Sequence, residues 1–277
     1  MLQKVLRFGR FTRHLPNVRG LTALRAFYEF MLPKGELRLS VDNFDGDLKM
    51  DVDVRDVIGI NIWHRPECFE KNERRLFCAA ITPGSLVLDV GANVGIYTLL
   101  AAKRGARVIA VEADPRNVEM LRRHIHLNGF DDRVSVLHMA ASDRDSALTL
   151  YRNSGNCGHS SLFKGHDPVV VPGKTIDSLG LPPIDVCKMD IEGAEMMALS
   201  GMRNSISRSP NLRLLIEYNP SLGQTNGMLE FLCERFRTAY EVRQPPLRAK
   251  GPLAATQRLP GFCNLWASKV ASDACFD

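Results

Sequence analysis

Along most of the chain, short runs of apolar and β-branched residues alternate with longer segments in which apolar residues recur at helical spacing. The short runs are typical of strands buried in a parallel sheet, and the longer segments are typical of helices packed on such a sheet. The predicted strands are residues 87–90, 107–112, 133–138, 184–189, 212–217, 240–243 and 262–267. The main predicted helices are residues 67–81, 96–102, 115–127, 228–236 and one that begins near residue 194. This alternation predicts an α/β fold with a mostly parallel seven-stranded sheet and helices on both faces.

The N-terminal part of the chain has a different pattern. Residues 1–32 carry six Lys or Arg side chains and one acid, and their apolar residues predict two short amphipathic helices separated by Pro16. The basic face of these helices could make a peripheral contact with an anionic membrane or a polyanionic substrate, or the helices could lie as a cap on the domain. Residues 36–63 alternate like a β-meander. We therefore divide the chain into a helical and β-meander extension, 1–66, and one larger domain, 67–277.

Composition limits the class of protein. Apolar residues make up 45% and charged residues 24% of the 277 residues, as in an ordinary globular protein, and the net charge of +5 is too small to indicate nucleic acid. The seven cysteines are scattered without a Cys-x-x-Cys pair, which argues against a disulfide framework or a zinc site and for a reducing compartment. No run approaches the ~20 apolar residues of a membrane span, and Arg7, Arg10 and Arg13 interrupt any secretory signal. We expect a cytoplasmic protein with no transmembrane segment.

The first strand of the larger domain ends in a glycine turn. Asp89 lies near the end of this strand, Gly91 and Gly95 follow with Asn93 between them, and a helix then begins. Glycine is expected where the backbone approaches a ligand, because a Cβ atom would hold the ligand away. The Gly-x-x-x-Gly spacing differs from the Gly-x-Gly-x-x-Gly of dinucleotide-binding proteins. Glu112 ends the second strand, about 20 residues further on, where a carboxylate can accept hydrogen bonds from a ribose diol.

The ends of the other strands add polar residues, and ligands of open α/β sheets lie across these carboxyl ends. After the third strand, Ser142 and Asp143 could bond an adenine edge, and the fourth strand ends in Lys188-Met-Asp-Ile-Glu-Gly-Ala-Glu195. The chain has no lysine-bearing phosphate loop, which disfavours ATP chemistry. An adenosyl ligand with an amino acid tail and a positive sulfonium fits better, with Asp89 on its ammonium group and the turn amides on its carboxylate.

Four motifs together resemble the FkbM family of S-adenosylmethionine-dependent methyltransferases. They are Asp89-Val-Gly-Ala-Asn-Val-Gly95, Glu112-Ala-Asp-Pro115, Gly158-His-Ser-Ser-Leu162 and Lys188-Met-Asp-Ile-Glu-Gly-Ala-Glu195. The resemblance covers residues 67–243 and implies a Rossmann-like methyltransferase fold, S-adenosylmethionine as cofactor, and O-methylation of a hydroxyl on a sugar, glycolipid or secondary metabolite. It also implies that Glu70 lies near the amino end of the cofactor. The residues expected to bind the cofactor are Glu70, Asp89, Gly91, Asn93, Gly95, Glu112, Ala113, Ser142, Asp143 and Asp190.

Methyl transfer to a hydroxyl requires a group that aligns the oxygen and a group that takes its proton. The candidates are Asp190 and Glu192 at the end of the fourth strand, with Lys188 nearby to tune their charge, and His159 in a loop that could fold over the site. Glu195 is a further acid at the same edge. Structural roles are the alternative: Glu192 could only stabilise the following helix N-terminus, and a loop histidine could simply be solvated.

Oxygen ligands for a metal could also converge at this edge. Asp190, Glu192, Glu217 and Asn219 all offer such oxygens. Nothing in their spacing requires a metal, and we expect none. Glu217 and Asn219 could instead contact the acceptor, or close the strand end before Pro220.

Two other functions compete with a small-molecule methyltransferase. An RNA methyltransferase would explain the basic N-terminus and the Leu127-Asn128-Gly129 segment that ends a helix. However, the fourth strand ends in Asp-Ile-Glu-Gly rather than Asn/Asp-Pro-Pro-aromatic, and aromatic residues do not interleave with the basic ones as a stacking surface would need. A cofactor-binding scaffold without catalysis is the second alternative, because a fold alone does not prove activity. We expect a small-molecule or saccharide hydroxyl acceptor, bound by loops 153–167, 219–227 and 244–261, and no nucleic acid.

Overall fold

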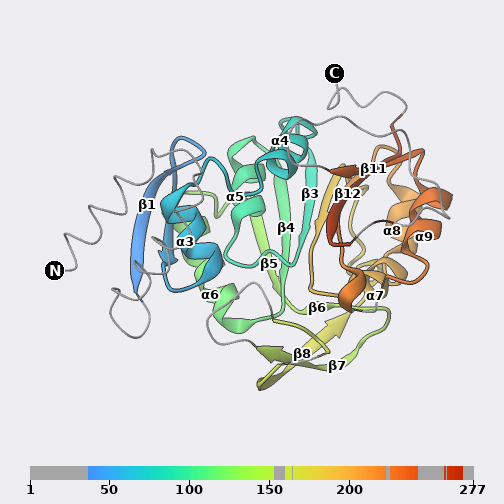
Figure 1. The fold of residues 1–277 in the computed structure, drawn as a ribbon. Coiled ribbons are helices and arrows are strands. Elements are labelled where there is room, and N and C mark those ends of the chain that lie inside the picture. Colours follow the sequence, from blue (N-terminus) through green and yellow to red (C-terminus); the bar gives the residue numbers. More distant parts are fainter. Residues whose placement is uncertain are drawn as a thin grey trace. The chain divides into compact units, whose positions relative to one another are not determined.

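The computed structural model describes residues 37–152, 160–163, 165–222, 225–242, 259 and 261–270 (Figure 1). The chain divides into two compact units, of which the first ends at Phe69 and the second begins at Glu70. The amphipathic helices predicted within residues 1–32 lie outside the described residues, as does the predicted base His159. The division into domains at residue 66 stays a prediction, because much of the N-terminal extension lies outside the described residues.

In the first unit, a hairpin is followed by a helix. β1 (Arg38–Phe44) and β2 (Leu48–Asp53) pair antiparallel, as the alternating pattern predicted. The meander predicted as far as residue 63 is wrong beyond these strands, where α3 (Val57–His64) forms. Asp56 explains the difference: its carboxylate caps the helix by accepting hydrogen bonds from the backbone amides two and three residues on, at 2.8 and 3.3 Å.

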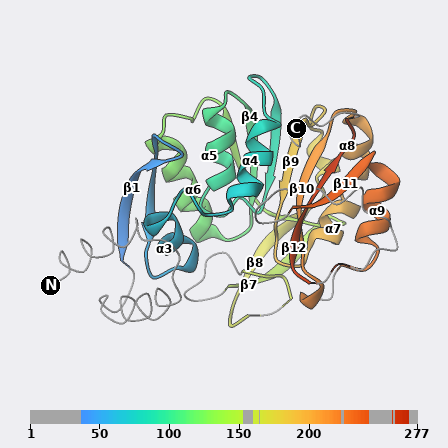
Figure 2. The ribbon, with the colours of Figure 1, turned by 45° about the horizontal axis from the view of Figure 1, so that its top comes forward.

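A seven-stranded sheet forms the centre of the second unit (Figures 1 and 2). Its strand order is β11 (Thr238–Val242), β12 (Cys263–Ser268), β10 (Arg213–Tyr218), β9 (Val186–Met189), β3 (Leu86–Val90), β4 (Arg107–Glu112) and β5 (Val134–His138). Neighbouring strands are parallel except at β12, which is antiparallel to both β10 and β11. The helices are α4 (Lys71–Ala79), α5 (Ile96–Lys103), α6 (Pro115–Leu127), α7 (Glu195–Ser200), α8 (Arg203–Arg208) and α9 (Met228–Arg235), which lie on both faces of the sheet. The predicted fold class is thereby confirmed.

The helix boundaries follow local signals with one exception. Pro115 opens α6 as predicted, and the Asp114 side chain accepts a hydrogen bond from the Arg116 amide at 2.9 Å. The helix predicted to begin near residue 194 does begin at Glu195, but it ends at Ser200, and a second short helix follows after Gly201. A Cβ atom at Gly201 would lie 1.9 Å from the Ser142 carbonyl oxygen, so the chain turns where it passes closest to that backbone.

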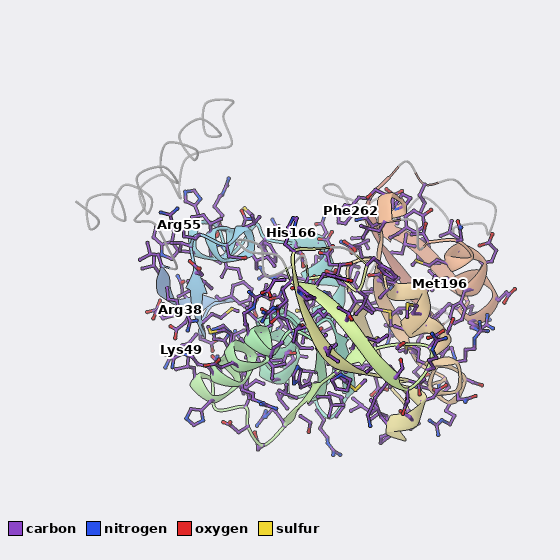
Figure 3. The ribbon with its side chains drawn as sticks, turned by 90° about the horizontal axis from the view of Figure 1, so that it is seen from below. Arg38, Lys49, Arg55, His166, Met196 and Phe262 are labelled. Carbon is purple, nitrogen blue, oxygen red and sulfur yellow. The ribbon has the colours of Figure 1, made fainter. Side chains whose placement is uncertain are left out.

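A smaller sheet of three strands accompanies the main one. Its order is β6 (Ala140–Ala141), β8 (Asp167–Lys174) and β7 (Ser146–Arg152). The end of the loop that joins β7 to β8 returns to β7, because Tyr151 and Ser161 exchange backbone hydrogen bonds of 2.8 and 2.9 Å. His166, just ahead of β8, is exposed (Figure 3). The described part of the polar loop, which includes Ser160 and Ser161, is therefore bonded to β7 of this sheet.

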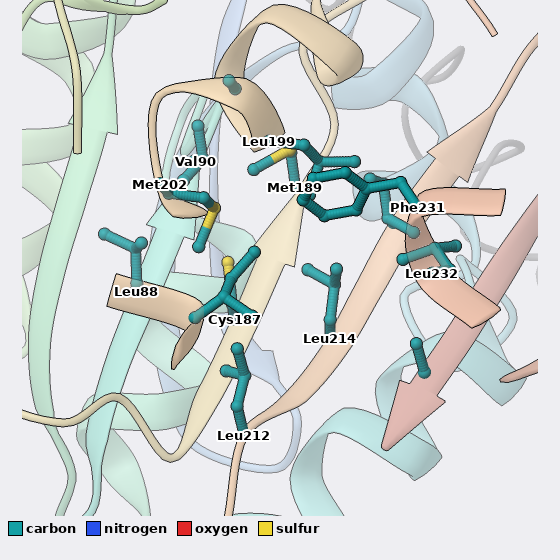
Figure 4. Close-up of a cluster of buried hydrophobic side chains, with 14 of the residues drawn as sticks. Leu88, Val90, Cys187, Met189, Leu199, Met202, Leu212, Leu214, Phe231 and Leu232 are labelled. Atoms are coloured by element: carbon teal, nitrogen blue, oxygen red, sulfur yellow. The ribbon is translucent and has the colours of Figure 1, made fainter. Parts of the chain in front are cut away.

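An apolar core lies between the main sheet and the helices α7, α8 and α9 (Figure 4). Its strand side chains include Leu88, Val90, Cys187, Met189 and Leu214. Leu199 of α7, Met202 of the turn before α8, and Phe231 and Leu232 of α9 pack against them. Because β3 and β9 are buried along their length, the charged residues Asp89 and Lys188 within them are buried as well.

None of the described helices is long and apolar enough to cross a membrane. The cytoplasmic location stays a prediction.

Candidate active site

The turn after β3 brings the ends of β3 and β9 close together. Gly91 has a φ of 80°, and a Cβ atom there would lie 1.9 Å from the Asp190 carbonyl oxygen. Gly95 has a φ of 101°, and its Cβ atom would lie 2.7 Å from the Leu121 side chain. Asn93, between the two glycines, is also left-handed with a φ of 52°. The packing of the protein around the turn therefore requires these glycines, in addition to the ligand approach for which we predicted them.

Asp89 is a buried acceptor with one unused oxygen. Its side chain is 1% exposed, and its Oδ2 atom accepts a hydrogen bond from the Thr98 hydroxyl at 2.6 Å. Its Oδ1 atom has no hydrogen-bond partner among the described residues. Burial raises the pKa of Asp89, against the opposing effects of Lys188 and Thr98. A buried oxygen without a partner fits a site where a ligand supplies the donor, as predicted for an ammonium group. The sequence analysis did not identify Thr98 as a site residue. The only sign of its role in the sequence is that it is a polar residue within an otherwise apolar helical run.

Glu112 connects the end of β4 to the glycine turn. Its Oε2 atom accepts a hydrogen bond from the Asn93 amide at 2.7 Å, and its Oε1 atom accepts one from the Asp114 amide at 2.8 Å. Burial raises the pKa of Glu112 to about 7. The Asn117 side-chain amide also donates a hydrogen bond to Oε1, at 3.5 Å. Because each carboxylate oxygen has two lone pairs, Oε2 can still accept a further bond from a ribose hydroxyl. Glu112 thus keeps the turn in place and retains the capacity for its predicted role.

Lys188 lies between several carboxylates. It lies opposite Asp89 in the register of the parallel strands β9 and β3. Its Nζ atom lies 3.0 Å from Oδ2 of Asp190. The same Nζ atom lies 5.0 Å from the centre of the Tyr97 ring. Burial lowers the pKa of Lys188, but Asp190, Asp89 and Glu70 together outweigh burial and raise it above its usual value. The lysine is therefore charged, and the structure brings it to the acids that we expected it to tune.

Glu70 joins the same charged group from the start of α4. It has a left-handed φ of 44°, and its Oε2 atom accepts a hydrogen bond from the Tyr97 hydroxyl at 2.7 Å. The Tyr97 ring packs edge-on against Phe77, with ring centres 4.9 Å apart. Burial raises the pKa of Glu70, and the charge of Lys188 opposes this rise. Glu70 therefore interacts with Lys188 near the glycine turn, where we predicted the amino end of the cofactor. Tyr97 is a second residue that sequence analysis missed.

Three carboxylates gather at the carboxyl ends of β9 and β10. One oxygen each from Asp190, Glu195 and Glu217 lies within 4.8 Å of the other two. Glu195 is fixed by the turn before α7, because its Oε1 atom accepts hydrogen bonds from the Ile191 amide at 2.9 Å and the Gly193 amide at 3.3 Å. Burial raises the pKa of both Glu195 and Glu217, and the charge of Asp190 raises both further. The fold thus makes one cluster of acids that lie up to 27 residues apart in the sequence.

The loop that contains His159 reaches this edge through two serines. The Ser160 hydroxyl donates a hydrogen bond to Oδ2 of Asp114 at 3.1 Å, and the Ser161 hydroxyl donates one to the Glu192 carbonyl oxygen at 3.0 Å. Glu192 has a left-handed φ of 55°. Such a backbone costs about 1–3 kcal/mol in a residue other than glycine and is found where the surroundings hold it. Ser160 and Ser161 therefore link the segments that follow β4 and β9.

The other residues predicted to bind the cofactor have less distinctive surroundings. Ser142 is fully buried, and its hydroxyl donates a hydrogen bond to Oδ1 of the exposed Asp143 at 3.3 Å. Ala113 packs against the small apolar cluster of β6, β7 and β8, and its carbonyl oxygen lies 3.1 Å from Nε2 of His138. The contacts of these residues with a cofactor stay predictions.

These groups lie at the carboxyl ends of the strands, where a methyltransferase of this fold class is expected to bind its cofactor. The buried, unpartnered oxygen of Asp89 fits the ammonium group of S-adenosylmethionine. The family model of the methyltransferase FkbM domain matches residues 89–239, which is more than half of the chain, and the chain belongs to this family. The predicted family and the predicted cofactor, S-adenosylmethionine, are thereby confirmed.

Individual relatives are distant. AMB antimetabolite synthetase AmbE of Pseudomonas aeruginosa is 23% identical over 240 residues, which cover 69% of this chain and 11% of that protein. The 2-O-methyltransferase NoeI of Sinorhizobium fredii is 24% identical over 169 residues, which cover 52% of this chain and 68% of that protein. Among solved structures, TYW2 of P. horikoshii in complex with MeSAdo matches with a TM-score of 0.44 and 17% identity, over 86% of this chain and 72% of that one.

Proposed function

We propose that this chain transfers the methyl group of S-adenosylmethionine to a hydroxyl oxygen of a small molecule or saccharide. The observation that carries the proposal is the carboxylate-rich edge beside the glycine turn, where the backbone of Asp190 packs against Gly91. A hydroxyl loses its proton on methylation, and a carboxylate beside the acceptor can take that proton. The relative NoeI, named a 2-O-methyltransferase, supports the same chemistry.

Three of the predicted residues would hold the cofactor through their side chains. Asp89 and Glu70 would bind its amino group, and Glu112 its ribose. When bound, S-adenosylmethionine supplies an electrophilic methyl group on a positively charged sulfur. The negative charges of Asp89 and Glu70 favour a positively charged ligand at this edge.

The acceptor would meet the acids at the end of β9. Glu192 would take the hydroxyl proton while the acceptor oxygen forms its bond to the methyl carbon. The left-handed backbone of Glu192, with its carbonyl held by Ser161, fixes where this residue stands. Asp190, whose Oδ2 atom accepts a hydrogen bond from the Lys188 Nζ atom at 3.0 Å, would orient the hydroxyl by accepting a hydrogen bond from it.

The experiment is methyl transfer from S-adenosylmethionine with a labelled methyl group to sets of sugars, oligosaccharides, glycolipids and phenolic metabolites, with transfer RNA as a further set. We expect label in an ether that resists alkali, at the position of a hydroxyl. Glu192→Gln should lower kcat by about 100-fold or more without weakening the binding of S-adenosylhomocysteine, because general base catalysis contributes about that much. Glu230→Gln, at an exposed position on α9, is the control. Transfer to nitrogen or to RNA would overturn the proposal, as would full activity in both Glu192→Gln and Asp190→Asn.

A further inference from the structure

The cluster of Asp190, Glu195 and Glu217 has the arrangement of a cation site. Met189 pairs with Ile216 across the parallel strands β9 and β10, so Asp190 and Glu217, each one residue further on, stand side by side. Glu195 joins them from the first turn of α7, and one carboxylate oxygen of each residue lies within 4.8 Å of the other two. Three negative groups at this distance repel one another unless a positive charge or protons lie between them.

Glu217 points to a ligand independently of the clustering. Its side chain is only 6% exposed, and its Oε2 atom is buried with no hydrogen-bond partner in the part of the chain that the structure describes. Buried carboxylate oxygens are almost always paired with a donor or a metal. The nearby cation Lys188 is bonded to Asp190, whose carboxylate has a second oxygen to offer. Glu195 likewise uses its Oε1 atom for backbone amides, which leaves Oε2 for another partner.

We propose that Asp190, Glu195 and Glu217 bind one divalent cation of the Mg²⁺, Mn²⁺ or Ca²⁺ type. The three donors are all carboxylate oxygens, which these hard cations prefer, and the cluster contains neither the thiolate nor the imidazole that typify zinc sites. Bonds from Ca²⁺ to oxygen are about 2.3–2.6 Å long, so two ligands on opposite sides of the ion lie about 4.6–5.2 Å apart. The observed limit of 4.8 Å therefore leaves room for an ion among the three groups.

A cation at this position would act on the acceptor, and this part of the inference rests on the proposed function. Three carboxylates leave coordination positions open, because these ions take six or more oxygen ligands. An acceptor hydroxyl bound at an open position would be oriented and would lose its proton more readily, since a metal lowers the pKa of a bound hydroxyl group. The proton would pass to Glu192, which lies outside the three ligands.

The test uses Mn²⁺ as the probe, because its electron paramagnetic resonance signal distinguishes free from bound ion. Mn²⁺ is titrated into the full chain after removal of metals with a chelator, and into Glu217→Gln, Glu195→Gln and the control Glu230→Gln. We expect one bound Mn²⁺ per chain in the wild type and the control, displaced by Mg²⁺ or Ca²⁺, and an affinity at least about tenfold lower in the two cluster variants. Calorimetry of S-adenosylhomocysteine binding, done with chelator present, shows which variants are folded.

The outcomes separate the two proposals. If the wild type binds S-adenosylhomocysteine but no Mn²⁺, or if a folded Glu217→Gln or Glu195→Gln variant binds Mn²⁺ as the control does, the cation site is refuted and the proposed function is unaffected. If the wild type binds Mn²⁺ through these residues but transfers methyl groups only to nitrogen, the cation site stands and the proposed function fails.

Discussion

Glu112 should make the folded protein less stable as the pH rises towards neutrality. Its side chain is 7% exposed, and burial raises its pKa from an ordinary value of 4.5 to about 7. The folded protein therefore holds this proton more tightly than the unfolded chain does. The resulting stabilisation is complete below the unfolded pKa and is lost as the pH rises through the folded pKa. At about 1.36 kcal/mol per pKa unit, the loss amounts to about 3 kcal/mol.

The perturbation is Glu112→Gln, which removes the ionisation. The amide group of glutamine has one acceptor oxygen, so it cannot serve the Asn93 and Asp114 amides together, and the variant loses about 1–3 kcal/mol at every pH. This cost does not depend on pH. The free energy of unfolding of the wild type minus that of Glu112→Gln should therefore fall by about 3 kcal/mol as the pH rises from 4.5 to about 7.

The assay is urea unfolding followed by circular dichroism, in small pH steps across this range, at constant ionic strength and without cofactor. Glu119→Gln, at an exposed position on α6, shows what exchanging a surface glutamate does to the same curves. The slope of the difference between wild type and Glu112→Gln is the diagnostic quantity. A difference that stays constant across the range would refute the reasoning, because it would mean that Glu112 ionises alike in the folded and unfolded states.

Three further substitutions test the site. Gly91→Ala should lower the free energy of unfolding by about 2–5 kcal/mol, because the new Cβ atom would clash with backbone and the left-handed φ would be strained. Gly84→Ala is the control, because Gly84 has a φ of 87° and no described atom within 4 Å of the added Cβ; it should lower the free energy of unfolding by only about 1–2 kcal/mol. Equal losses of unfolding free energy in the two variants, measured by urea unfolding, would contradict the close approach at Gly91. Asp89→Asn should weaken S-adenosylhomocysteine binding by about 10–100-fold in calorimetry, since a hydrogen bond to a charged group contributes about 1.5–3 kcal/mol; an unchanged affinity would remove Asp89 from the cofactor site. Ser161→Ala should lower kcat by about 10–100-fold with little change in KM for the cofactor, because it frees the backbone of Glu192, and an unchanged kcat would show that the loop does not position this residue.

The sequence by itself determined the α/β alternation, the position of each strand end and the glycine turn. These features are local: apolar runs, Pro115 at a helix start and glycines at left-handed positions act within a few residues. Because parallel strands present their carboxyl ends at one edge, the sequence also placed Asp89, Glu112 and Asp190 at a common site. The same local reasoning failed over residues 57–64, where alternating isoleucines mimic a strand but the capping carboxylate of Asp56 starts a helix.

Only the tertiary structure decided which of these groups meet and in what state of charge. The pairing of β9 with β10 places Glu217 beside Asp190. Hydrogen bonds from the turn amides before α7 hold the Glu195 side chain next to these two acids. Thr98 and Tyr97 became partners of Asp89 and Glu70 because α5 packs beside the strand and helix that carry those acids. The physical reason is that strand register and burial come from contacts between segments distant in the sequence, and burial in turn sets the pKa of each acid.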